Sequence, residues 1–345
     1  MRIAADRLKQ FTSSIFAAVG CLEHEADRIA HYLVEANLAG HDSHGVIRVP
    51  FYVEWAKVGK VVPNQHLKVV LENEVIAVVD GQYGFGQVLG EEAMQLGIAK
   101  AETHGVAVIA LRNVGHLGQI GAWPLLVARA GLTSLHWVNT SGAGILVAPF
   151  GGINRRLSAN PIAAGVPVRD GEPIILDMSA CTIAEGKIKV ALNKGVQVPP
   201  NCIIDSKGGP TTDPKVFYAS PPGAILSIAG HKGYGLGIIA EVLAGALTGG
   251  GCSNPANAGR LGNGMLSIIL DQRVFQAEDA FAAEIERFIT WVKSAQTTTP
   301  NGEILMPGEP EARNRVQRLR DGIELDDTTW GQLTAVGKSL GVGAV

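Results

Sequence analysis

A regular alternation of strand-like and helix-like segments limits most strongly what this chain can fold into. Residues 67–81, 106–113 and 132–139 carry the apolar alternations and apolar runs that are typical of strands. Residues 90–105 and 119–131, which lie between them, carry apolar side chains at helical spacing. With 43 glycines and 46% apolar residues, the chain also has the tight turns and the large core that such a fold requires. The pattern therefore predicts an α/β protein.

The later part of the chain continues this pattern. We expect short strands within residues 155–167 and 173–180, a small-residue helix over residues 233–247, a strand over Leu266–Asp271 and a helix over residues 281–292.

The two ends of the chain are predicted to be helical. Near the N-terminus, apolar residues recur at helical spacing, and Gly40 is placed to end the second helix. The C-terminal segment is polar with two helical patches, and chain ends often lie close together. We therefore expect residues 1–65 plus about 296–345 to form a helical domain. Residues 66–295 should form an α/β domain, with a subdivision near residues 120–270.

Charge and cysteine usage argue against several classes of protein. The net charge is −3, from 29 basic and 32 acidic residues, so we expect neither a nucleic-acid partner nor a polybasic membrane surface. The four cysteines are far apart in the sequence, which disfavours a disulfide framework or a zinc site. The apolar stretch Gly235–Leu247 is too short to span a bilayer, and the N-terminus lacks the apolar core of a signal peptide. We expect a cytoplasmic protein without a metal site.

One glycine-rich stretch imitates a dinucleotide-binding fingerprint. "GFGQVLG", Gly84 to Gly90, follows a strand and begins a helix, but its spacing is one residue too long for that motif. The next strand ends in Arg112 and Asn113, where the motif would have an acidic residue for the ribose. Glycines that serve tight turns are the favoured interpretation.

The stretch "GHDSHGVIR", residues 40–48, concentrates polar groups in an apolar chain. Asp42, Ser43 and His44 could be taken for a hydrolase triad, but adjacent residues rarely reach the geometry that a triad needs. His41 and His44 could share one face and bind a metal, but their spacing to other residues offers no third ligand. Both interpretations are disfavoured.

Acid–base chemistry suits this stretch better. A histidine titrates near neutrality, so His44 could give a proton to a carbonyl or imine and take it back. Arg48 follows one helical turn later, where an arginine could grip a substrate carboxylate with two hydrogen bonds. An N-terminal cap with a surface arginine explains the spacing equally well.

Three further positions are candidates for a ligand site. His116 stands between Gly115 and Gly118 after a buried strand, where backbone N–H groups gather for an anion. Lys232 lies between glycines at a helix start and would suit a phosphate. Asp177 ends a strand, which suits a ribose or substrate hydroxyl.

The motifs taken together resemble a known family. "HDSHGVIR", "NVGHLG", "APFGG", "NPIA", "LDM" with "EGK", "PTTDP" and "HKGYG" occur in this order. They resemble the malate/L-lactate dehydrogenase family that lacks a Rossmann fold and includes sulfolactate, ureidoglycolate and Δ1-piperideine-2-carboxylate enzymes. "ANLAGHDSHG", "VPPNCIID" and "MPGE" are most similar to members of the hydroxycarboxylate dehydrogenase B type.

The resemblance implies a fold and an activity. The fold would be a non-Rossmann, mixed-sheet α/β fold of the sulfolactate dehydrogenase type. The activity would be NAD- or NADP-dependent transfer of a hydride to or from C2 of a 2-hydroxy or 2-oxo carboxylic acid, in a homodimer. His44 would be the proton donor, Ser43 would help to set its state, Arg48 would hold the carboxylate and His116 would complete the catalytic set.

The resemblance also implies a set of cofactor contacts. They are His116, Leu117, Gly118, Gln119, Ile120, Asn160, Asp177, Met178, Ser179, Lys187, His231, Lys232, Gly308 and Glu309.

Two departures from the family pattern keep alternatives open. Ala159 stands where relatives usually have a threonine on the substrate side, so a non-catalytic nucleotide-binding protein is one alternative. Lys187 stands where some cyclic-imine reductases have an aspartate, and it could instead hold a phosphate or an acidic substrate. Reduction of cyclic imino acids is the other alternative.

Overall fold

The computed structural model describes residues 1–142, 144–257 and 259–343. Its central element is a seven-stranded sheet with the strand order β2-β3-β4-β11-β5-β6-β7. The strands are β2 (Lys68–Glu72), β3 (Ile76–Asp80), β4 (Val106–Val114), β11 (Leu261–Leu270), β5 (Thr133–Gly142), β6 (Ile162–Val166) and β7 (Ile174–Met178). β3 and β4 pair in parallel, and the other neighbours in this sheet pair antiparallel. The predicted mixed α/β architecture is confirmed.

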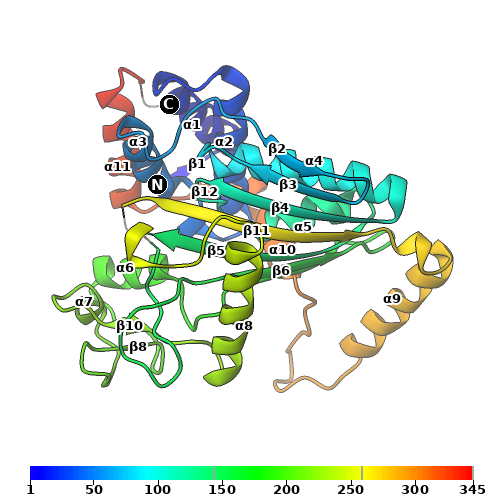
Figure 1. The fold of residues 1–345 in the computed structure, drawn as a ribbon. Coiled ribbons are helices and arrows are strands. Elements are labelled where there is room, and N and C mark those ends of the chain that lie inside the picture. The colour runs from blue at the N-terminus through cyan, green and yellow to red at the C-terminus, as the bar shows by residue number, and fades with distance from the viewer. Residues whose placement is uncertain (143, 258, 344–345) are drawn as a thin grey trace.

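Helices cover both faces of this sheet (Figure 1). α4 (Gly86–His104) and α5 (Ala122–Arg129) pack on one face, and α8 (His231–Glu241) lies across the other and continues as a π-helical turn, Val242–Ala246. The core between the sheet and α4 and α5 includes Ile109, Leu111, Trp123, Met265 and Ile269, all fully buried. Apart from Met265, which precedes the predicted strand Leu266–Asp271, these side chains belong to the segments whose apolar pattern predicted the elements.

The glycines of "GFGQVLG" are explained by close packing at the start of α4. A Cβ atom at Gly86 would overlap the backbone carbonyl of His116, and one at Gly90 would lie 2.6 Å from the ring of Trp123. The motif therefore brings α4 against the segment that carries His116. Gly86 and Gly90 lie within α4, so the favoured interpretation of tight turns is wrong for them, and close packing explains them without a dinucleotide fingerprint.

The two ends of the chain meet in one helical region. It contains β1 (Arg2–Ile3), α1 (Ala5–Ala18), α2 (Glu23–Leu38), α3 (Val49–Lys57), α10 (Glu309–Asp321), β12 (Ile323–Glu324) and α11 (Asp327–Ser339). β1 pairs antiparallel with β12, and Leu8 and Phe11 share an apolar core with Ile323 and Leu333. The predicted domain boundaries stay a prediction.

Several elements differ from the sequence prediction or escaped it. β11 begins at Leu261 rather than Leu266, because pairing with both β4 and β5 extends the strand through a glycine-containing segment. A second sheet joins β10 (Ala224–Ile225), β8 (Ile203–Ile204) and β9 (Pro210–Thr211) beside α6 (Glu185–Lys194) and α7 (Pro214–Phe217). Strands of two residues are too short to show an apolar period.

The helix α9 (Glu278–Lys293) projects from the body of the molecule (Figure 1). On its predicted apolar face Phe288 is 48% exposed, while Phe281, Ile285, Ile289 and Val292 are half-buried, and Trp291, which was not part of that face, is 71% exposed.

Candidate active site

The turn after α2 carries the residues on which the functional prediction rests. Gly40 has a φ of 93°, as expected for a glycine that ends a helix, and two 3₁₀ turns follow, Asp42–His44 and Val46–Arg48. Gly45 separates these turns in an extended conformation. The prediction that Arg48 lies one helical turn after His44 is therefore wrong, because the chain changes direction between them.

Asn37 at the end of α2 holds this turn in place. Its Nδ2 donates to Asp42 Oδ1 at 2.7 Å, and its Oδ1 accepts from the Val46 backbone N–H at 2.9 Å. A Cβ atom at Gly45 would overlap the Asn37 side chain, so this position requires glycine. Asp42 also receives two hydrogen bonds from Arg318 of α10, at 2.7 and 3.1 Å.

Arg48 folds back onto the residue that precedes His44. Its Nε donates to the Ser43 carbonyl oxygen at 2.6 Å, and Ser43 Oγ lies 3.1 Å from His44 Nδ1. Gly186 of α6 packs on both residues, because a Cβ atom there would lie 2.9 Å from Ser43 Cβ and 3.4 Å from Arg48 Nη2. Within the described ranges, Arg48 has no ion-pair partner, so its terminal nitrogens are free to bind a carboxylate.

His116, which follows β4, lies beside His44. The two imidazole rings are stacked, with 5.7 Å between centroids and 11° between planes. Tyr52 of α3 brings its hydroxyl to 2.6 Å from His116 Nδ1, and Gln87 of α4 donates to the Tyr52 oxygen at 3.1 Å and to the His116 carbonyl oxygen at 3.3 Å. Segments from three parts of the chain thus converge on one pair of imidazoles.

The electrostatics of this pair favour the neutral rings. Burial lowers the pKa of His44 well below its ordinary value, and the charge of Arg48 lowers it further. Burial and then Arg48 lower the pKa of His116 to about 3. Both imidazoles are therefore neutral at pH 7, and a neutral imidazole can accept a proton or donate a hydrogen bond.

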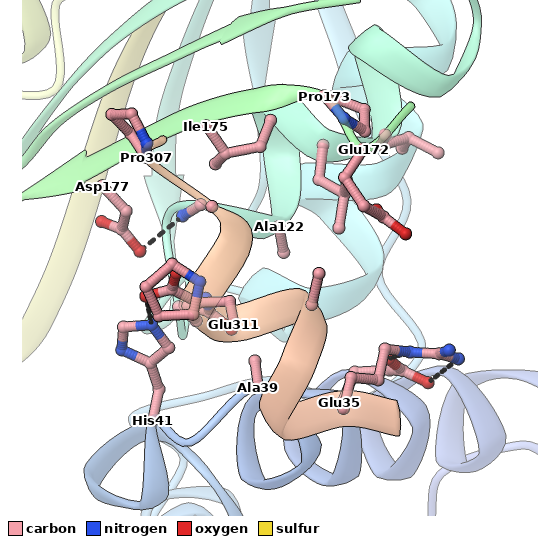
Figure 2. Close-up of a pocket in the computed structure, with 18 of the residues that line it drawn as sticks. Glu35, Ala39, His41, Ala122, Glu172, Pro173, Ile175, Asp177, Pro307 and Glu311 are labelled. Atoms are coloured by element: carbon pink, nitrogen blue, oxygen red, sulfur yellow. Dashed lines mark hydrogen bonds and ion pairs between the residues drawn. The ribbon is translucent and has the colours of Figure 1, made fainter. Parts of the chain in front are cut away.

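The structure also contains a cavity of about 530 Å³ (Figure 2), and His44, Arg48 and His116 are not among the residues that line it. It is lined by side chains from α2, α5, β7 and α10, and His41 and Gln119, which lie close in sequence to His44 and His116, are among them. Asp177 accepts a hydrogen bond from the Gly121 backbone N–H at 2.8 Å, and His41 Nε2 lies 3.2 Å from Glu311 Oε1. Burial raises the pKa of Asp177, although the Gly121 amide partly offsets this.

Several of the expected cofactor residues lie at this cavity. Gln119, Asp177 and Gly308 line it. Gly308, with a φ of 96°, packs closely on Ile175 and would not tolerate a side chain. Glu309, the first residue of α10, pairs with Lys293 and accepts from the Met306 backbone N–H at 3.0 Å.

Other expected cofactor residues lie in the core or are half-buried. Leu117 and Ile120 are buried in the core beneath the sheet. Gly118, with a φ of 73°, lies next to the Gln87 amide. Met178 ends β7, and Ser179 Oγ donates to the Cys181 carbonyl oxygen at 3.1 Å. Direct contact between these side chains and a cofactor stays a prediction.

Asn160 is fully buried and satisfied by protein groups. Its Nδ2 donates to Glu241 Oε2 at 2.7 Å and to the Gly237 carbonyl oxygen at 2.9 Å, and its Oδ1 accepts from Ser158 Oγ at 2.5 Å. The structure thus places Asn160 as a link between the sheet and α8. Ala159, beside it, is partly buried against an apolar cluster.

Lys187, His231 and Lys232 do not line the large cavity. Lys187 of α6 borders a smaller cavity of about 250 Å³, although its charge is near enough to lower the pKa of His44. His231 and Lys232 begin α8, where the His231 ring lies 5.9 Å from that of Phe150. Their roles toward a cofactor stay a prediction.

The sequence analysis missed Tyr52, Gln87 and Gly186. Tyr52 follows Arg48 by one helical turn, so a polar aromatic side chain beyond the arginine was an available signal. Gln87 lies inside the glycine motif that was attributed to turns. Gly186 belongs to the "EGK" motif, but its packing on Ser43 depends on long-range contacts.

The described residues include neither a cluster of metal-ligating side chains nor a membrane-spanning helix. In the parts of the chain that the structure describes, no three His, Cys, Asp or Glu side chains are grouped so that they could hold a metal ion. Among the described helices, none combines the length and the apolar character needed to cross a membrane.

Comparison with known proteins agrees with the geometry. The family described as Malate/L-lactate dehydrogenase matches residues 3–334. Hydroxycarboxylate dehydrogenase B of Escherichia coli (strain K12) is 41% identical over 345 residues, which cover 99% of this chain and 95% of that protein.

Solved structures extend the likeness to the fold. Sulfolactate dehydrogenase from Methanocaldococcus jannaschii superposes with a TM-score of 0.86 at 34% identity, covering 100% of this chain and 98% of that one. Δ1-piperideine-2-carboxylate reductase from Pseudomonas syringae gives a TM-score of 0.85 at 27% identity, covering 97% and 99%. The predicted fold of the sulfolactate dehydrogenase type is confirmed, and the chain belongs to the malate/L-lactate dehydrogenase family.

Proposed function

We propose that this protein is a nicotinamide-dependent dehydrogenase of 2-hydroxy carboxylic acids, which also reduces the corresponding 2-oxo acids. One observation carries the proposal. Two neutral imidazoles and an arginine with free terminal nitrogens lie together, and their sequence neighbours His41 and Gln119 line a cavity of about 530 Å³, within the size range of cofactor sites. Such a site offers a proton acceptor, a hydrogen-bond donor and a carboxylate anchor around one substrate.

Arg48 would bind the substrate carboxylate. Its Nε is held by the Ser43 carbonyl oxygen, so the guanidinium is fixed in place and presents its two terminal nitrogens together. A planar guanidinium matches a carboxylate with two parallel hydrogen bonds. This grip would place C2 of the substrate, with its hydroxyl or carbonyl oxygen, near the imidazole pair.

His44 would handle the proton. In the oxidation of a hydroxy acid, a neutral His44 accepts the proton of the C2 hydroxyl, and in the reverse reaction the imidazolium returns it. Ser43 Oγ, 3.1 Å from His44 Nδ1, can accept from or donate to that nitrogen, so it supports both forms of the ring.

The residues around the large cavity suit a nicotinamide cofactor. Gln119, Gly121, Asp177 and Gly308 would hold it, with buried polar groups next to backbone that a side chain would block. When bound, the nicotinamide supplies or accepts the hydride at C2. The proposal covers NAD and NADP alike.

A second candidate is the reduction of cyclic imino acids. It is favoured by the likeness to Δ1-piperideine-2-carboxylate reductase, whose whole chain superposes on this one. Arg48 and His44 could serve a cyclic imine as they serve a 2-oxo acid, since both substrates carry a carboxylate next to the reducible carbon. Lys187 in place of an aspartate makes the hydroxy-acid reaction our first choice.

We also propose that the protein is a homodimer. The exposed side chains of Phe288 and Trp291 on the projecting helix α9 would gain from coverage by a second copy.

The test is an absorbance assay of reduced nicotinamide with purified protein. NADH and NADPH would each be offered with pyruvate, oxaloacetate, phenylpyruvate, the oxo form of ureidoglycolate and Δ1-piperideine-2-carboxylate. Oxidation of a reduced cofactor with a 2-oxo acid supports the proposal. Oxidation with the cyclic imine alone would transfer the function to the second candidate, and no oxidation with any pair would contradict both.

A further inference from the structure

The two imidazoles of the site have hydroxyl partners of different kinds. His44 Nδ1 faces Ser43 Oγ at 3.1 Å, and no second partner of that hydroxyl is found among the described residues. His116 Nδ1 faces the Tyr52 hydroxyl at 2.6 Å, and that hydroxyl also contacts Gln87. Tyr52 is 2% exposed and Gln87 is 1% exposed, so water does not replace these contacts.

The direction of each hydrogen bond around Tyr52 follows from the position of Gln87. Gln87 Nε2 lies 3.1 Å from the Tyr52 oxygen and 3.3 Å from the His116 carbonyl oxygen, which can only accept. If the amide were flipped, Gln87 Oε1 would face that carbonyl oxygen, and two acceptors would repel each other. Gln87 therefore donates to both oxygen atoms.

The Tyr52 oxygen accepts from Gln87, and among the described residues the only acceptor that its own proton can reach is His116 Nδ1. A phenol has one proton, and His116 Nδ1 is its neighbour at 2.6 Å. His116 Nδ1 then acts as an acceptor, and the proton of the neutral ring must sit on Nε2. That N–H finds no acceptor among the described residues, so it is free for a ligand.

The same arrangement resists protonation of His116. A protonated His116 would direct its Nδ1–H at the hydroxyl hydrogen of Tyr52. A protonated His44 would instead meet the Ser43 hydroxyl, which can rotate to accept the Nδ1–H. The charged groups around the pair act against this difference, so the distinction between the rings rests on their hydroxyl partners. Arg48 disfavours a charge on either ring, while His41 and Lys187 act on His44.

We propose that the two histidines divide the work. His44 carries the proton, and His116 stays neutral and donates a hydrogen bond from Nε2 to the oxygen on C2 of the substrate. Tyr52 and Gln87 are positioning residues that impose this state on His116. The substrate part of this inference rests on the proposed function. A neutral donor of fixed direction stabilises charge that develops on the substrate oxygen without reorganising itself.

The test is nitrogen-15 NMR of protein with labelled histidines, without substrate, over a pH range around 6.5. In the wild type, we expect His116 to show one neutral tautomer with the proton on Nε2. Tyr52→Phe should remove the constraint on the His116 tautomer, so that the other tautomer or an imidazolium of His116 becomes visible. Gln87→Met, which leaves the phenol in place, should shift His116 in the same direction by a smaller amount.

The matched internal control is His136. It is fully buried between Ser134 and Ser267, away from Tyr52, and its signals should not change in either variant. A wild-type His116 with its proton on Nδ1, or one that titrates together with His44, would overturn the proposal. A His116 spectrum unchanged in both variants would overturn the role of Tyr52 and Gln87.

A kinetic measurement completes the test. Tyr52→Phe should lower kcat by roughly 10-fold, the value of one neutral hydrogen bond, with little change in KM. It should also add a second ionisation to the pH profile of kcat, which a purely structural role would not do. Because the NMR experiment needs no substrate, an inactive protein with the expected His116 tautomer would contradict the proposed function and leave the tautomer assignment standing.

Discussion

The imidazole rings of His44 and His116 lie nearly parallel, with 5.7 Å between their centroids. Arg48 lies close enough to lower the pKa of both rings. Protonation of both imidazoles would therefore add two positive charges next to that of Arg48. At most one of the two imidazoles can be protonated during a reaction. The arrangement therefore suits a single proton transfer with one histidine in each role.

Replacing His44 removes the proposed proton carrier. In His44→Ala, turnover should fall by roughly 100- to 10,000-fold, the usual contribution of a general acid–base, while cofactor affinity changes little. Steady-state rates and a fluorescence titration of reduced cofactor measure the two quantities. Unchanged turnover would remove His44 from the mechanism.

Arg48→Lys tests the carboxylate anchor. A lysine keeps the charge but loses the planar pair of donors, so kcat/KM should fall by roughly 10- to 100-fold, mainly through a higher KM. The matched control is a substrate analogue whose carboxylate is replaced by an amide. Wild type and variant should turn this analogue over at similar rates, and an equal loss with both compounds would argue against the anchor.

Gly186→Ala tests the packing of α6 on the catalytic turn. The added methyl would lie 2.9 Å from Ser43 Cβ and 3.4 Å from Arg48 Nη2, so it should displace both residues and reduce kcat/KM by about 10-fold or more. The control is Gly331→Ala in α11, where a Cβ atom meets no described atom within 4 Å. That variant should keep full activity, and equal activity of the two variants would contradict the role of Gly186.

The pH dependence follows from the lowered pKa of His44. For hydroxy-acid oxidation, kcat/KM should rise with pH through a pKa below 6.5 and level off near neutrality, because the neutral ring must accept the proton. Reduction of the oxo acid should have the opposite slope. A bound substrate carboxylate offsets the charge of Arg48, which lowers the pKa of His44. The pKa of His44 seen in the profile of kcat should therefore exceed the one seen in the profile of kcat/KM. An oxidation rate that falls as the pH rises through this range would refute the assignment.

The dimer proposal is tested on α9. Phe288→Glu together with Trp291→Glu should turn a dimer into a monomer in light scattering after size exclusion, because charges replace the apolar side chains that a second copy would cover. Glu286→Gln, on the same helix, is the control and should leave the mass unchanged. A wild-type protein that already has the mass of one chain would contradict the proposal.

Much of the fold could be predicted because apolar periodicity reports burial directly. Residues 106–113 form most of a buried strand, Gly105 ends α4 in a left-handed conformation, and Gly40 follows the end of α2. Strands of two residues, such as β8, carry no such period and were not predicted. The start of β11 was misplaced because it depends on pairing with β4 and β5.

The site could be predicted where its residues are neighbours in sequence. Ser43, His44 and Arg48 share one short stretch, but their mutual geometry depends on Gly45 and was predicted incorrectly. The contact between Tyr52 and His116 spans a sequence separation of 64 residues, so spacing could not reveal it. Asn160 belongs to a family motif and was expected to contact the cofactor. Its side chain is instead buried and hydrogen-bonded to a residue of the distant helix α8, which spacing could not reveal either.

The most direct test of the central claim is the fate of the transferred hydrogen. Reduced cofactor would carry deuterium at one or the other C4 position of the nicotinamide, and the product of 2-oxo acid reduction would be analysed by mass spectrometry and NMR. The proposed reaction predicts one deuterium at C2 of the product, from one C4 position only, and none at C2 from heavy water. A C2 hydrogen that comes from the solvent would contradict hydride transfer at this site.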